Sequence, residues 1–71
     1  MITKIGITAG DIWYYLEKHQ RSGLTKIGKG IDKPRDDLLM SIGWLAREGH
    51  IVVEKLGDEY EVWLRESEPA R

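Results

Sequence analysis

The first regular pattern of apolar positions in the chain is that of an amphipathic helix. Its members recur at i, i+3, i+4 and i+7: Ala9, Ile12, Trp13 and Leu16. Thr8 precedes this stripe as a candidate N-cap, and Asp11 stands three residues on, where a weak form of the capping box reaches back. We therefore predict a helix over residues 9–20, with residues 1–7 as an extended lead-in and Gly23 as a helix terminator.

A second, shorter helical pattern follows. Its apolar members are Leu24, Ile27 and Ile31. Thr25 is a candidate cap for a helix over residues 26–30. Gly28 and Gly30 weaken this helix, because glycine costs up to about 1 kcal/mol relative to alanine in a helix interior. The glycines thus predict a close approach to a neighbouring helix, and their spacing matches no phosphate-binding fingerprint.

The third pattern, from Asp32 to Gly49, is the longest and organises the rest of the chain. Asp32 is a candidate N-cap, Pro34 suits the first helical turn, and Gly49 marks the end. The predicted core face has five members: Leu38, Leu39, Ile42, Leu45 and Ala46. Met40 and Trp44 lie four residues apart on a different face.

Residues 51–64 alternate between apolar and polar positions and predict a β-hairpin. Gly57 and Asp58 fit a two-residue type II′ turn, which requires glycine at its first central position. This turn pairs Ile51 with Leu64, Val53 with Val62 and Lys55 with Tyr60 on a face that we assign to the core. On the opposite face it pairs Val52 with Trp63, Glu54 with Glu61 and Leu56 with Glu59.

This order of elements predicts the fold class. Three helices followed by a β-hairpin wing are the elements of a winged helix-turn-helix domain, an α+β fold. We expect a single domain over residues 1–66 and a polar C-terminal tail over residues 67–71.

Two segments also resemble a known family. They are Thr8-Ala9-Gly10-Asp11-Ile12-Trp13 and Ile42-Gly43-Trp44-Leu45-Ala46-Arg47-Glu48-Gly49. Both are similar to segments of small stand-alone bacterial winged helix-turn-helix domains, whose biochemical role is largely unassigned. The resemblance covers nearly the whole chain. It implies the fold and a role in binding DNA, and it transfers no catalytic or ligand residues.

Composition excludes several kinds of site. The chain has no cysteine and only two histidines, so we expect no disulfide, no metal site and no cofactor. His19 and His50 are better explained as residues at helix ends than as catalytic groups, and we predict that the domain is not an enzyme. The N-terminus has no long apolar run, so we expect neither a signal peptide nor a membrane span, and a cytoplasmic location.

The charge is divided unevenly along the chain. Residues 1–35 hold seven Lys or Arg against three acids, whereas residues 36–71 hold four against nine. Phosphate contacts from basic side chains supply most of the sequence-independent affinity for DNA. The candidate DNA-binding residues are Arg21, Lys26, Lys29, Lys33 and Arg35. Two features argue against DNA binding. They are the acidic wing and the two acids Asp36 and Asp37 at the start of the third helix.

The aromatic residues support a second hypothesis. Three tryptophans and three tyrosines are many for a 71-residue chain, and aromatic residues and methionine are enriched at protein interfaces. The candidate interface residues are Tyr14, Met40, Trp44, Val52 and Trp63. The sequence therefore leaves two functions open. One is a DNA-binding module with a role in transcription regulation, whose affinity for DNA is weak and depends strongly on salt. The other is a homodimeric or partner-binding module with little DNA affinity.

Overall fold

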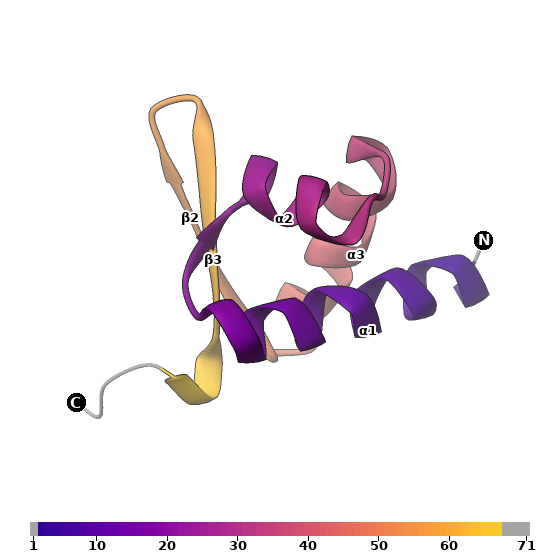
Figure 1. Cartoon of the computed structure of the whole chain (residues 1–71). Coiled ribbons are helices and arrows are strands. Elements are labelled where there is room, and N and C mark those ends of the chain that lie inside the picture. The colour runs from indigo at the N-terminus through magenta and orange to yellow at the C-terminus, as the bar shows by residue number, and fades with distance from the viewer. Residues whose placement is uncertain (1, 68–71) are drawn as a thin grey trace.

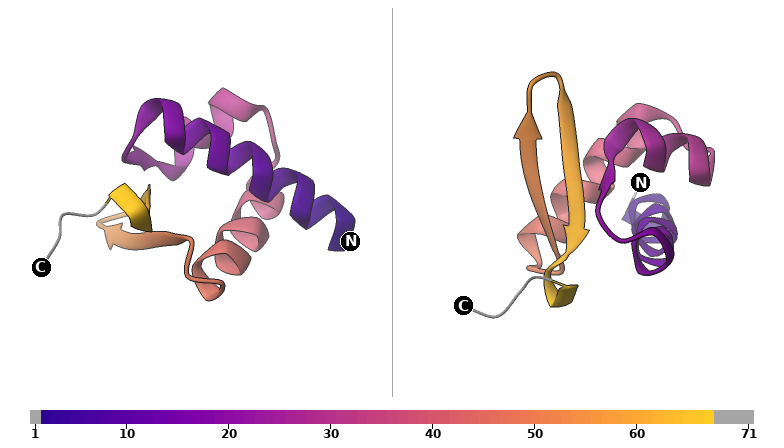
Figure 2. Two further views of the ribbon diagram at one scale, coloured as in Figure 1. Left: turned by 90° about the horizontal axis from the view of Figure 1, so that it is seen from below. Right: turned by 60° about the vertical axis from the view of Figure 1, so that its left-hand side comes forward.

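The computed structural model describes residues 2–67, so residues 68–71 of the predicted tail over 67–71 lie outside the described part. Its elements are α1 (Ile2–His19), β1 (Ser22–Gly23), α2 (Leu24–Ile31), α3 (Arg35–Arg47), β2 (Ile51–Leu56), β3 (Glu59–Leu64) and a 3-10 turn, η1 (Arg65–Ser67). In Figure 1, α1 crosses below α2 and α3, and the β2–β3 hairpin stands beside them. Figure 2 shows the hairpin on one side of the helices. The predicted winged helix-turn-helix fold is confirmed.

Helix α1 begins earlier than predicted. The expected lead-in over residues 1–7 is wrong from Ile2 onward, because the chain is already helical there. Thr8 is not a cap: it lies inside the helix with an exposed fraction of 0%. The added turns are held by α3, since the hydroxyl of Ser41 donates a hydrogen bond to the carbonyl of Ile5 at 3.1 Å. Tertiary packing thus overrides a local capping signal.

Helix α2 confirms the predicted close approach at both glycines, although its N-cap is Gly23 and not Thr25. An ideal Cβ on Gly30 would lie 2.2 Å from Cε2 of Tyr15, which belongs to α1. An ideal Cβ on Gly28 would lie 2.8 Å from Cδ1 of Leu38, which belongs to α3. The two glycines therefore allow a short helix to pack tightly between two longer ones.

Helix α3 begins after Asp32. The predicted cap role of Asp32 is wrong, because its backbone lies in the left-handed region (φ 54°) and closes the end of α2. Pro34 takes the N-cap position with an extended backbone. Gly49 (φ 79°) ends the helix as predicted. The N–H of Gly49 donates to the carbonyl of Ala46 and that of His50 to the carbonyl of Leu45, which is the pattern of a Schellman cap.

The core face of α3 is narrower than predicted. Leu38, Ile42 and Leu45 are buried, but Leu39 and Ala46 are exposed. Ser41 is buried in their place, because its hydroxyl is satisfied by α1.

The hairpin has the predicted register at all six pairs, from Ile51 opposite Leu64 to Leu56 opposite Glu59. Gly57 has a φ of 63° and Asp58 does not have a positive φ, as a type II′ turn requires. The short strand β1 was not predicted. It pairs with β3, so the described sheet has the order β1-β3-β2.

The core lies between the helices and the inner face of this sheet. Its buried apolar residues are Ala9, Ile12, Leu16, Leu24, Ile27, Leu38, Ile42, Leu45, Ile51, Val62 and Leu64. Among the described helices, none is long and apolar enough to cross a membrane.

Candidate nucleic-acid interface

Four of the five predicted DNA-binding residues gather on α2, the turn after it and the first residue of α3. They are Lys26, Lys29, Lys33 and Arg35, which we call the basic edge. Lys29, Lys33 and Arg35 line one open groove of about 340 Å³ between α2 and α3. Lys26, Lys29 and Arg35 are exposed and Lys33 is half-buried. The fold therefore places three of these cations around one groove, and Lys26 lies on the same helix as Lys29.

The basic edge is only partly neutralised within the domain. Lys33 Nζ lies 3.9 Å from Oδ2 of Asp11 on α1, which is a weak ion pair. Lys26 and Lys29 form no ion pair or hydrogen bond through their side chains within residues 2–67. Both ammonium groups are therefore available to an external anion.

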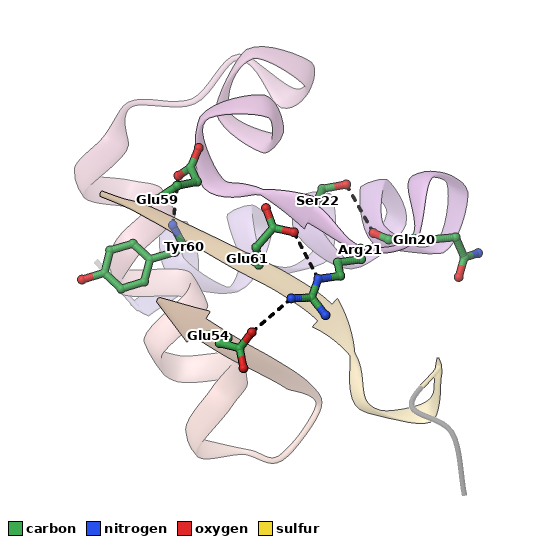
Figure 3. Close-up of polar contacts among 7 residues, drawn as sticks. All are labelled: Gln20, Arg21, Ser22, Glu54, Glu59, Tyr60 and Glu61. Carbon is green, nitrogen blue, oxygen red and sulfur yellow. Dashed lines mark hydrogen bonds and ion pairs between the residues drawn. The ribbon is translucent and has the colours of Figure 1, made fainter. Parts of the chain in front are cut away.

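Arg21, the fifth candidate, is engaged elsewhere. Its Nε donates to Glu61 at 3.1 Å and its Nη2 donates to Glu54 at 3.1 Å (Figure 3). Its guanidinium also lies 4.2 Å from the centroid of the Trp63 ring. Arg21 thus neutralises the two glutamates that oppose each other across β2 and β3, and it is held on the outer face of the sheet.

Glu59 on β3 has a structural role beside the basic edge that the sequence did not reveal. Its Oε2 accepts a hydrogen bond from the backbone N–H of Thr25 at 3.4 Å, in the first turn of α2. The N-cap residue Gly23 has no side chain to cap this helix, so a carboxylate from the wing takes that role. An ideal Cβ on Gly23 would lie 3.1 Å from the same oxygen, so glycine leaves room for it.

The environment of Glu59 makes its capping role dependent on pH. Desolvation opposes ionisation, but hydrogen bonds from Tyr60 and Thr25 and the charge of Arg35 outweigh it and lower the pKa of Glu59 from its ordinary value of 4.5. A lowered pKa in the folded state stabilises the fold above the unfolded pKa. This contribution disappears as the pH falls through the folded pKa.

We therefore expect Glu59→Gln to destabilise the domain near neutral pH and to have less effect in acid. The measurement is urea unfolding between pH 3 and pH 7. The difference between wild type and variant should be largest above about pH 4.5, where the carboxylate is ionised in both states. Glu17→Gln, on the exposed surface of α1, is the matched control. A difference that is constant across this range would contradict the assigned role.

The outer face of α3 is mainly apolar, which is unusual for the helix that winged helix-turn-helix domains place in the major groove. Its exposed members are Asp36, Leu39, Met40, Gly43, Trp44 and Arg47. Asp37 is withdrawn from this face, since its Oδ2 lies 3.5 Å from Nζ of Lys4 on α1. Beside this face lies an apolar groove of about 280 Å³ between α3 and the hairpin.

The five predicted interface residues lie on three different elements or faces. Met40 (39% exposed) and Trp44 (47%) share α3. Tyr14 is 71% exposed on α1 and lines a separate groove between α1 and α2. Val52 and Trp63 form a half-buried cross-strand pair on the outer face of the sheet, where Arg21 covers the Trp63 ring.

Comparison with known proteins places this architecture in a family. A family of winged helix-turn-helix domains, DUF2582, matches residues 1–64, which is most of the chain. The chain belongs to the DUF2582 family of winged helix-turn-helix domains. Its fold is similar to the solution NMR structure of protein BT2368 from Bacteroides thetaiotaomicron, with a TM-score of 0.79 and 20% sequence identity. That match covers 97% of this chain and 89% of the other.

No curated protein matches the chain. Membership in DUF2582 confirms the resemblance seen in the sequence. Winged helix-turn-helix domains are typically DNA-binding and typically lack a catalytic centre. For this DUF2582 domain, the basic edge is the surface at which that property is best tested.

Proposed function

We propose that this domain binds double-stranded DNA through the basic edge, as a non-catalytic module of transcription regulation in the bacterial cytoplasm. The observation that carries the proposal is the gathering of Lys29, Lys33 and Arg35 around one groove at the α2–α3 turn, with Lys26 on the same helix as Lys29. Helix-turn-helix domains approach the DNA backbone with this region.

The chemistry of the basic edge favours phosphate over base recognition. Three of its four cations are lysines, whose ammonium groups contact phosphate as point charges, and phosphate contacts carry no sequence information. The outer face of α3 offers one basic side chain, Arg47, and several apolar ones. Binding should therefore be weak and largely independent of sequence.

The wing limits the contact to this edge. Residues 51–66 carry five acids against two basic residues, and the turn at Gly57 and Asp58 has no cation. Many winged domains make a second DNA contact through the wing. Here repulsion between the acidic wing and phosphate prevents that contact. The docked orientation then depends on α2 and the start of α3.

A random duplex of about 16 base pairs, titrated at low salt, tests the proposal. We expect saturable binding whose affinity falls as salt rises, with a slope in log–log form of roughly −2 to −4 for two to four phosphate contacts. The measurement is fluorescence anisotropy of the labelled duplex. An absence of binding at the lowest salt would overturn the proposal.

A second candidate function is protein binding, in which case DNA affinity is low. The specific observation in its favour is the exposed apolar face of α3 with Met40 and Trp44. The two functions use different surfaces, because neither residue belongs to the basic edge. One chain can therefore perform both.

A further inference from the structure

The outer face of α3 has a regular stripe at its centre. Asp36, Met40, Gly43 and Arg47 recur at intervals of four, three and four residues, which places them along one side of a helix. All four are exposed. They lie opposite the buried residues of the same helix, Leu38, Ser41, Ile42 and Leu45. Nothing in the described chain covers the stripe.

Packing within the described monomer does not require glycine at position 43. An ideal Cβ at this position meets no described atom within 4 Å, in contrast to Gly28 and Gly30, where a Cβ would clash. Glycine in the middle of a helix lowers helix stability relative to alanine. A glycine between Met40 and Trp44 does, however, let another helix approach the backbone of α3 closely.

The charges at the two ends of the stripe identify the helix that would approach. Asp36 is at the start of α3 and Arg47 at its end. Neither side chain forms an ion pair within residues 2–67. If two copies of α3 pack antiparallel about a two-fold axis between Met40 and Gly43, each Asp36 faces the partner's Arg47. The stripe is therefore complementary to itself.

We propose that α3 is the interface of a symmetric homodimer, in which the Asp36–Arg47 stripe of one copy packs antiparallel on that of a second copy. This inference goes beyond the proposed DNA binding and does not depend on it. The two-fold axis places both Trp44 side chains on one flank of the helix pair and both Leu39 side chains on the other. The apolar groove beside Leu39, lined also by Val53 and Tyr60, adds apolar surface from the wing.

The accessible surface of the domain sets the share that a dimer contact would need. A stable interface buries about 800 Å² on each partner, and a two-fold homodimer is the commonest closed assembly. Such a contact would cover about a sixth of the 4885 Å² of accessible surface. It would occupy the α3 face that a recognition helix otherwise turns toward bases, and it includes no residue of the basic edge.

Charge reversal at the two ends of the stripe provides the test, with sedimentation equilibrium as the readout. The wild-type chain should be a dimer whose dissociation constant is measurable by dilution. Asp36→Arg alone, or Arg47→Asp alone, turns both symmetric contacts from attractive to repulsive. Each variant should weaken the dimer about tenfold or more. Circular dichroism confirms that each variant is folded.

The decisive sample is an equimolar mixture of the two variants. The chain with Asp36→Arg has a positive charge at both ends of its stripe, and the chain with Arg47→Asp has a negative charge at both ends. In a mixed antiparallel dimer each positive end faces a negative end, so both contacts are again attractive. We therefore expect the mixture to recover dimers with an affinity near that of the wild type.

The control is Glu17→Arg, a charge reversal on the exposed surface of α1 that should leave the dimer unchanged. A wild-type chain that stays monomeric at millimolar concentration would overturn the proposal. The proposal would also be overturned if neither charge reversal changed the dissociation constant of the dimer. The same holds if the mixture associated no more tightly than each variant alone. DNA titrations of Arg47→Asp keep the two proposals separate, because Arg47 lies at the opposite end of α3 from the basic edge.

Discussion

Alanine at Gly30 and alanine at Gly43 should change the stability of this domain in opposite directions. A Cβ on Gly30 would lie 2.2 Å from Cε2 and 2.9 Å from Cδ2 of Tyr15, closer than packed atoms approach. The Tyr15 ring stacks on His19, with 4.2 Å between ring centroids, so moving it disturbs a second contact. Overpacking of this kind costs about 1–3 kcal/mol, which outweighs the gain of up to about 1 kcal/mol from replacing a helical glycine.

At Gly43, alanine brings the same gain in helix stability without a steric clash. No described atom lies within 4 Å of the added Cβ, so Gly43→Ala should raise the free energy of unfolding by about 0.5–1 kcal/mol. The measurement is urea unfolding followed by circular dichroism, at concentrations low enough to keep the chain monomeric. Gly10→Ala on the exposed side of α1 is the matched control, because a Cβ there is also unobstructed. Equal effects at Gly30 and Gly43 would show that the close packing of α2 on α1 is wrong.

The second large effect concerns DNA. Reversing the two unpaired charges on α2 with Lys26→Glu and Lys29→Glu should weaken binding of a random duplex about 100-fold at low salt. Two phosphate contacts are lost and two repulsions added, so the salt slope should also become shallower by about 2. The change should leave the fold intact, because neither lysine has a partner within residues 2–67.

The matched variant is Met40→Gln on the outer face of α3. It changes an exposed apolar side chain without changing charge, and we expect DNA affinity to stay within about threefold of the wild type, since no phosphate contact is removed. Fluorescence anisotropy at several salt concentrations measures both variants. A larger loss from Met40→Gln than from the double reversal would mean that α3 reads the major groove.

Much of the fold was predictable because the relevant signals are local. The glycine at position 57 and the alternation on either side of it are enough to determine the hairpin register, and all six predicted pairs are present. Gly28 and Gly30 likewise indicated close helix packing, because glycine in a helix interior needs a reason outside the helix.

The failures arise where distant parts of the chain decide the outcome. Thr8, with Asp11 after it, has the local signature of a helix start, yet packing of the first turns of α1 against α3 extends the helix to Ile2. Asp32 was assigned to the wrong helix, because an aspartate between two helices can serve the end of one or the start of the other.

The same limitation applies to the candidate site. The basic edge could be predicted because its members lie within ten residues of one another. The ion pairs of Arg21 join residues 33 and 40 positions apart, and the contact of Glu59 with Thr25 spans 34 positions. No local pattern in a single sequence reports such pairs. The one available hint was Glu54 opposite Glu61, a like-charge pair that calls for a cation between its members.

The structure therefore separates two surfaces that a winged helix-turn-helix domain usually combines. The cations lie on α2, in the turn after it and at the first residue of α3, whereas the outer face of α3 is mainly apolar and self-complementary in charge. Our central proposal is that DNA binds the surface formed by these cations and not the outer face of α3.

The most direct test is to follow backbone amide signals by NMR while a random duplex is added at low salt. A 71-residue chain is well suited to this measurement. We expect the largest shifts to fall within residues 24–36, with small changes over residues 39–47. Shifts centred on residues 39–47, with little change on α2, would contradict binding through the basic edge.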